Sequence, residues 1–151
     1  MTSQKPITRL FYAQTLIFIS AGGIHNDPQN ELALVAWMSE EGSPAAWNPF
    51  SCSVPLPGST TLSGNPDGVQ NYVSLDQGLQ AFGETLTGSN PSYKYPPILA
   101  ALKTGECACA VVEAVANSSW GTWLHNPTAA DTFMLDVQDY WAYYSTQEIV
   151  R

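Results

Sequence analysis

The stretch Leu32-Ala-Leu-Val-Ala-Trp-Met-Ser-Glu-Glu-Gly42 is a nearly all-apolar run that ends in two adjacent carboxylates and a glycine. Asp27 precedes it as a suitable helix N-cap, and Pro28 suits the first helical position. The stretch therefore predicts a buried helix that ends near Glu41. A glutamate in the last turn of a buried helix lies where the core meets the following loop. We expect burial to raise the pKa of such a carboxyl and to keep its proton available for transfer.

The two carboxylates at this helix end are not equivalent. At about 100° per residue, Glu41 lies between Trp37 and Met38 on the apolar stripe. Glu40 lies about 100° away on a more exposed edge, so Glu41 is the candidate proton donor. The alternative is that both are solvated residues at the end of a core helix, because structural carboxylates far outnumber catalytic ones. Carboxylates at a helix C-terminus also oppose the helix dipole, which is a mild cost to stability.

Length and composition predict one globular domain over residues 1–151. Charged residues make up 12% of the chain and hydrophobic residues 44%, a balance typical of a folded core. The formal net charge is −8, and the five Lys and Arg residues are scattered along the sequence. Nucleic acids and anionic membranes are bound by clustered cations, so neither is an expected partner.

The apolar segment 10–23 follows two cations and resembles the core of a short signal peptide. Gln14 and Thr15 interrupt it, and it falls short of the roughly 18 apolar residues that a membrane span requires. We expect an ordinary buried first helix from about Pro6 to Ser20. A cleaved signal is the alternative.

Helix start and stop signals predict a mainly α fold with an irregular middle. Proline and glycine density excludes helix between Gly42 and Tyr72, although short strands fit there. Ser74 is suited to cap the next helix. The expected strands lie near 60–62 and 69–73, and further helices near 75–87, 95–102 and 107–116. The aromatic-rich segment 131–149 has poor periodicity, so that helix and extended chain both stay open.

The three cysteines point to no metal site. Cys107 and Cys109 are too close for an ordinary disulfide between helical neighbours. Cys52 can pair with one of them only if its loop lies beside the later helix. The three cysteines and the two histidines of the chain do not form a typical set of ligands for structural zinc. We therefore expect reduced, buried thiols and no cofactor.

Five short motifs follow one another along the chain. They are Ala36-Trp-Met-Ser-Glu-Glu-Gly42, Asn48-Pro-Phe50, Pro57-Gly-Ser59, Gly68-Val-Gln-Asn-Tyr-Val-Ser74 and Ser119-Trp-Gly-Thr122. In this order they resemble the motifs of the lysozyme-like domains of actinobacterial phages. The resemblance covers about residues 30–122, and residues 123–151 form an aromatic-rich C-terminal extension outside it.

The resemblance implies an α+β lysozyme-like fold, in which an irregular or short β-hairpin region lines a cleft. It implies cleavage of peptidoglycan glycan strands, by a muramidase or a lytic transglycosylase of the virion or the host cell wall. Glu41 matches the family's catalytic acid, and Asn48, Tyr72 and Trp120 match residues that bind substrate. Ser51-Cys-Ser53 departs from the family's Asn-Thr-Thr, which affects the polar contacts of the loop.

Cleavage of a glycosidic bond requires a proton donor and a group that stabilises the positive centre. Asp67, in the turn Gly64-Asn-Pro-Asp-Gly68, is the loop candidate for the second carboxylate. The alternative is that Asp67 is a simple turn residue. A single glutamate is also sufficient in lytic transglycosylases, because the acetamido group and a hydroxyl of the substrate assist.

A second hypothesis is a structural virion protein that retains this fold without activity. The acidic net charge is unfavourable for approach to an anionic cell wall. The aromatic tail, in turn, suits docking onto other virion proteins. We expect Tyr140, Trp141 and Tyr144 to be buried against the body of the protein or against a neighbouring subunit. A cysteine peptidase is excluded, because no Cys is followed by a suitable His in a helix-start context.

Overall fold

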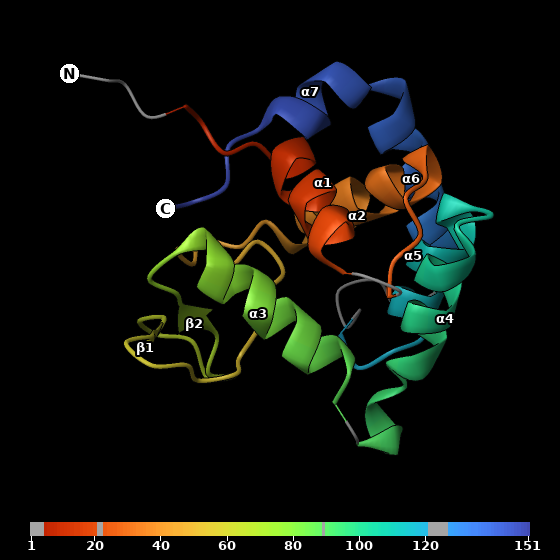
Figure 1. Cartoon of the computed structure of the whole chain (residues 1–151). Coiled ribbons are helices and arrows are strands. Elements are labelled where there is room, and N and C mark those ends of the chain that lie inside the picture. Colours follow the sequence, from red (N-terminus) through yellow and green to blue (C-terminus); the bar gives the residue numbers. More distant parts are fainter. Residues whose placement is uncertain (1–4, 21–22, 89, 121–126) are drawn as a thin grey trace.

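A computed structural model of the chain describes residues 5–20, 23–88, 90–120 and 127–151. Within these ranges the fold is mainly helical, with one small antiparallel sheet, as the sequence predicts (Figure 1). The elements are α1 (Arg9–Ile19), α2 (Pro28–Glu41), β1 (Thr60–Thr61), β2 (Gln70–Asn71), α3 (Leu75–Leu86), the 3₁₀ helix η1 (Pro91–Tyr93), α4 (Pro96–Thr104), α5 (Ala108–Ala116), α6 (Pro127–Asp139) and α7 (Trp141–Thr146).

Helix α2 is the central element of the fold. It packs against α1, α5, α6 and α7, and its residues from Leu32 to Met38 are all buried. The Asp27 carboxylate accepts a hydrogen bond from the backbone N–H of Gln29 (2.8 Å) at the start of the helix. Gly42 ends it in the left-handed conformation, with φ of 53°. The predicted boundaries of this helix are therefore confirmed, and its lack of a polar face follows from packing on several sides.

An aromatic cluster around Trp37 joins α2 to the rest of the core. The Trp37 ring lies 5.0 Å from that of Phe50, 5.4 Å from that of Phe82 and 4.7 Å from that of Trp120, measured between centroids. These partners belong to the proline-rich loop, to α3 and to the segment after α5. The cluster therefore holds three distant parts of the chain around one end of α2.

The segment between Gly42 and Tyr72 is irregular except for the two short strands. Thr60 pairs with Asn71 and Thr61 with Gln70 in antiparallel register. Together with α3, the hairpin lies on one side of the molecule, whereas α4 to α7 lie away from it (Figure 1). The expectation of a short hairpin in a proline-rich loop is confirmed.

The first helix begins three residues later than expected. The Thr8 hydroxyl accepts a hydrogen bond from the N–H of Phe11 (3.1 Å) and so fixes the start of α1 at Arg9. Tyr12 and Leu16 are buried, whereas Phe18, on another face, is 87% exposed. Among the described residues, no helix has the length and apolar character that crossing a membrane requires.

The C-terminal segment forms two helices, α6 and α7. Of helix and extended chain, which the sequence left open, it is therefore mainly helical. Trp141 and Tyr144 are half-buried, but Tyr140 is 63% exposed. The prediction that Tyr140 packs against the body is therefore wrong. Tyr140 lies at the junction of α6 and α7, and Met134 and Val137 provide the buried face of the segment instead. Burial of Tyr140 by another subunit stays a prediction.

Backbone hydrogen bonds hold the C-terminal residues between the N-terminal segment and the loop. The N–H of Ile149 donates to the carbonyl oxygen of Ile7 (2.9 Å), and the N–H of Arg9 donates to that of Gln147 (2.9 Å). The N–H of Trp47, in the loop, donates to the carbonyl oxygen of Val150 (2.7 Å).

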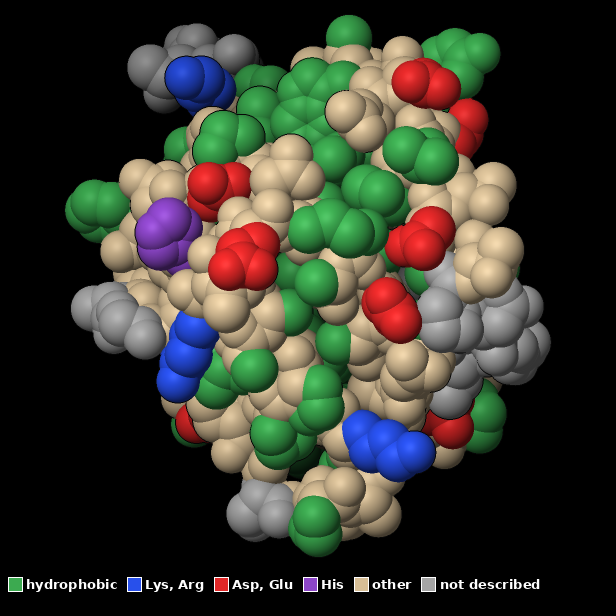
Figure 2. Space-filling model, turned by 90° about the vertical axis from the view of Figure 1, so that its right-hand side faces the viewer, with side chains coloured by type: hydrophobic (Ala, Val, Ile, Leu, Met, Phe, Trp, Pro, Cys, Tyr) green, Lys and Arg blue, Asp and Glu red, His purple; other side chains and the backbone are tan. Residues whose placement is uncertain are grey.

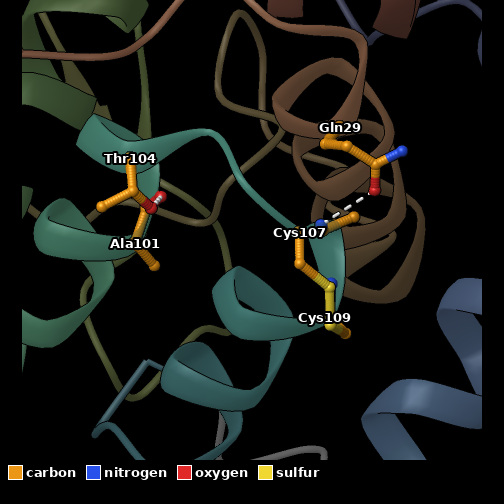
Figure 3. The surroundings of a disulfide bond; sticks show 6 residues. Gln29, Ala101, Thr104, Cys107 and Cys109 are labelled. Carbon is orange, nitrogen blue, oxygen red and sulfur yellow. Dashed lines mark hydrogen bonds between the residues drawn. A yellow bond between two sulfur atoms is a disulfide. The ribbon is translucent and has the colours of Figure 1, made fainter.

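The cysteines differ from the expectation. Cys107 and Cys109 form a disulfide, whereas Cys52 is free and buried as expected (Figure 3). The prediction assumed two helical neighbours. Cys107 is instead the extended N-cap of α5, with φ of −154° and ψ of 127°. This conformation places the two Cα atoms 5.2 Å apart, within the range of ordinary disulfides.

Candidate functional site

A cavity of about 330 Å³ lies at the C-terminal end of α2, and we call it the Glu41 cavity. One wall comes from the irregular loop and the hairpin. The other comes from the end of α2, from α3 and from the segments that flank α4 and α5. The lining residues are Glu41, Ser51, Cys52, Ser53, Asp67, Val69, Thr85, Tyr95, Ser119 and Trp120.

Glu41 is the last residue of α2 and is half-buried. The left-handed conformation of Gly42 turns the chain out of the helix directly after it. The side chain follows the buried Trp37 by one helical turn, as the periodicity predicts. The helix therefore delivers a carboxylate from the hydrophobic core to the wall of the cavity.

Glu40 does not line the Glu41 cavity, although it too is half-buried. Burial raises the pKa of Glu40. Both carboxylates are half-buried, but of the two only Glu41 lines the cavity. Glu40 is therefore a matched control for Glu41.

Cys52 lies in the wall of the cavity as a neutral thiol. Burial raises the pKa of Cys52 to about 12, a hydrogen bond with Thr85 opposes this effect, and the negative charge of Glu41 adds to it. Because the thiolate is the nucleophilic form, this cysteine is inert at neutral pH. Glu41 and Cys52 line the same cavity.

Tyr95 provides a neutral phenol at the edge of the cavity. Burial raises its pKa, and the charges of Tyr93, Cys52 and Glu41 add to the shift in that order. Its ring centroid lies 5.2 Å from that of Trp120 at an interplanar angle of 52°, so two tilted aromatic rings lie side by side in the lining of the cavity.

Asp67 lies in the hairpin turn, exposed, and lines the same cavity as Glu41. The Asn65 side-chain oxygen accepts hydrogen bonds from the backbone N–H of Asp67 (2.9 Å) and from that of Val69 (3.2 Å). Gly68 takes the left-handed conformation that the turn requires, with φ of 76°. Asp67 is thus both a turn residue and a cavity residue.

Asn48 is buried behind the loop wall and does not line the cavity. Its side-chain NH₂ donates to the carbonyl oxygens of Cys52 (2.8 Å) and Gln70 (2.7 Å). Its side-chain oxygen accepts from the backbone N–H of Cys52 (2.8 Å). In this structure Asn48 therefore joins the loop to β2 and holds the residues that line the cavity.

Tyr72, like Asn48, is buried behind the loop wall and does not line the cavity. It is 3% exposed, and its hydroxyl donates to the carbonyl oxygen of Val54 (2.8 Å). Burial, followed by the charges of Cys52 and Glu84, raises its pKa. Tyr72 therefore anchors the loop from behind.

Trp120 lines the cavity. It is 8% exposed, and its indole N–H donates to the carbonyl oxygen of Phe50 (2.8 Å). The hydrogen bond and the edge-to-face contact with Trp37 hold the ring in place. Gly121 and Thr122 of the same motif lie outside the described residues.

The cavity includes residues that sequence reasoning did not select. Thr85 lies three residues after the buried Phe82, on the same side of α3. A polar residue at such a position in the sequence could have indicated a cavity residue. Tyr95 precedes two prolines and gave no comparable signal. Ser51 has φ of 56°, a left-handed backbone at a residue other than glycine, which is often found at functional sites.

Comparisons with protein families, with curated proteins and with solved structures found no match to this chain. Within the described part of the chain, no group of three or more His, Cys, Asp or Glu side chains is placed to hold a metal ion.

Proposed function

We propose that this chain is a lysozyme-like domain that cleaves the glycan strands of peptidoglycan, with Glu41 as the proton donor. One observation carries the proposal: Glu41 and Asp67, from distant parts of the chain, line one cavity together with Tyr95 and Trp120. Its volume of about 330 Å³ is within the range of small-ligand sites. The sequence resemblance described above supplies the substrate class.

The proposed chemistry begins with a protonated Glu41. Its proton passes to the oxygen of the leaving sugar while the glycosidic bond breaks, which leaves positive charge on the other sugar. Glu41 is half-buried at the end of α2 and lines the cavity proposed to hold the substrate. The negative charge of Asp67, or the acetamido group of the substrate, then stabilises the positive centre.

The aromatic residues of the cavity suit a sugar substrate. Trp120 and Tyr95 offer flat apolar surface next to the carboxylates, and the hydroxyls of Ser51, Ser53 and Thr85 offer hydrogen bonds. A sugar ring combines an apolar face with a polar edge, so this combination of groups is complementary to it. Asn48 and Tyr72 act indirectly in this proposal, by holding the loop wall.

The test is incubation of purified peptidoglycan with the full chain, followed by mass spectrometry of the soluble products. Hydrolysis adds one water molecule to each cleaved bond and yields a reducing end. Transglycosylation yields an internally closed sugar that is lighter by one water molecule. The proposal is supported if the wild-type chain yields either product and Glu41→Gln yields neither. Cleavage of peptide bonds alone contradicts it.

Asp67→Asn separates a mechanism with two carboxylates from one with a single glutamate. The change keeps the size of the side chain and leaves the backbone N–H groups that Asn65 holds in the turn. If Asp67 stabilises the positive centre, we expect a loss of rate of about 10²-fold or more. If the substrate performs this role, the rate stays near that of the wild type.

A structural virion protein is the second candidate, because large hydrophobic side chains are exposed on the C-terminal segment that contains α6 and α7. Tyr140 is 63% exposed, Tyr143 62% and Leu135 53%. Figure 2 shows one face on which apolar side chains form a strip with acidic side chains on both sides. A wild-type chain without activity on peptidoglycan, but incorporated into a virion, favours this candidate.

A further inference from the structure

The Cys107–Cys109 disulfide lies at the start of α5 (Figure 3). Cys107 is the N-cap residue, and its sulfur accepts a hydrogen bond from the backbone N–H of Cys109 (3.1 Å). Both residues are partly exposed, in contrast to the buried Cys52. The bond is therefore placed where thiols from solution can approach.

This disulfide contributes little to holding the fold together. Its two cysteines are separated by one residue, and the entropic stabilisation from a disulfide grows with the length of the loop it closes. Other contacts hold the start of α5. The Gln29 side-chain oxygen accepts from the N–H of Ala108 (3.1 Å), and Val111 and Val115 are buried in the core. The bond can therefore open without unfolding the helix.

The helix N-terminus makes the two sulfurs unequal. The backbone N–H of Cys109, which donates to the Cys107 sulfur, and the helix dipole stabilise a negative charge at the N-cap, which is the position of Cys107. The adjacent Glu106 carboxylate opposes this effect, but it is exposed and screened by water. When a thiolate attacks the disulfide, Cys107 is therefore the better leaving group.

We propose that Cys107 and Cys109 form a reversible dithiol–disulfide couple that exchanges an electron pair with a cysteine pair of a partner protein. The first thiolate of the partner attacks the Cys109 sulfur, the S–S bond breaks, and Cys107 leaves with the electron pair as a thiolate. The partner's second thiolate then attacks the sulfur of the partner's first cysteine in this mixed disulfide. Cys109 is released as a thiolate. The partner loses two electrons and gains a disulfide, and Cys107 and Cys109 become a dithiol.

Charge narrows the class of partner. The chain carries a formal net charge of −8, and Glu106 and Glu113 are exposed next to and on α5. Anionic thiols are repelled by this surface at low ionic strength. This negative charge therefore favours partner proteins whose cysteine pair lies in neutral or basic surroundings.

The first test uses the full wild-type chain in mixtures of reduced and oxidised dithiothreitol. After acid quenching and alkylation, peptide mass spectrometry reports the redox state of each cysteine, and circular dichroism follows the fold in the same mixtures. We expect one two-electron transition at Cys107 and Cys109, with the helical signal retained. A pair that stays oxidised until the chain unfolds overturns the proposal, as does a pair that does not reoxidise.

The second test compares the two sulfurs. Serine is a preferred N-cap, so Cys107→Ser keeps the cap of α5 and leaves Cys109 free, and Cys109→Ser leaves Cys107 free. We expect iodoacetamide at pH 7 to alkylate Cys107 about tenfold faster than Cys109, because the N-cap position stabilises the Cys107 thiolate. In the wild-type chain, 2-mercaptoethanol is expected to form its adduct on Cys109. Equal rates together with an equal distribution of the adduct contradict the proposal.

Discussion

Replacement of Asn48 by alanine tests whether one buried amide holds the wall of the Glu41 cavity. The change leaves the backbone N–H of Cys52 and the carbonyl oxygen of Gln70 without their side-chain partner. The Cys52 carbonyl oxygen keeps a hydrogen bond from the N–H of Gln70 (3.0 Å). At roughly 1–3 kcal/mol for each buried group that loses its partner, we expect a loss of about 3 kcal/mol in the free energy of unfolding.

For a domain of this length, 1 kcal/mol corresponds to about 2–4 °C in Tm, so Asn48→Ala is expected to lower Tm by about 6–12 °C. Thermal unfolding followed by circular dichroism measures the change. Asn117→Ala, at an exposed asparagine, is the matched control and is expected to lie within about 0.5 kcal/mol of the wild type. A Tm of Asn48→Ala equal to that of this control refutes the reasoning.

Four further variants test the packing, the charge and the C-terminal segment. A Cβ on Gly78 would collide with the carbonyl oxygen of Trp47, whereas one on Gly83, in the same helix, would meet nothing within 4 Å. Gly78→Ala is therefore expected to destabilise the chain by about 2 kcal/mol, and Gly83→Ala to stabilise it by about 0.5–1 kcal/mol, in urea unfolding; the opposite order contradicts the packing. Because burial raises the pKa of Glu40, the folded chain binds this proton more tightly than the unfolded chain, and stability falls as the pH rises through that pKa. Glu40→Gln is then expected to raise Tm at pH 7 and to leave it unchanged at pH 3, so a lower Tm at pH 7 rules out this effect. Deletion of residues 147–151 removes backbone hydrogen bonds to the N-terminal segment and to the loop, and we expect a clear loss of Tm; an unchanged Tm shows that these contacts contribute nothing.

Local signals were sufficient to predict most helix boundaries. The caps at Asp27 and Ser74 and the left-handed glycines Gly42 and Gly105 act within one turn of the residues they affect. For that reason, the end of α2, and with it the placement of Glu41, could be predicted without tertiary information. The proline-rich loop was equally predictable, because prolines exclude helix whatever surrounds them.

Long-range placement decided the features that the sequence did not predict. Thr85 and Tyr95 line the same cavity as Glu41 because α3 and the segment before α4 pack against the aromatic cluster. The role of Asn48 in holding the loop depends on β2, far along the chain, whereas the sequence resemblance implied only contact with substrate. The disulfide was missed because the helix was expected to include Cys107, whereas α5 begins one residue later.

The most direct test of the proposed mechanism compares the rates at which wild-type chain, Glu41→Gln and Glu40→Gln release soluble fragments from purified peptidoglycan. Both substitutions remove one carboxylate from the same helix end, but only Glu41 lines the cavity. We expect Glu41→Gln to lose about 10²-fold or more in rate and Glu40→Gln to stay near the wild type. Equal rates for the two variants, or no release by the wild-type chain from several types of peptidoglycan, would contradict Glu41 as the catalytic acid.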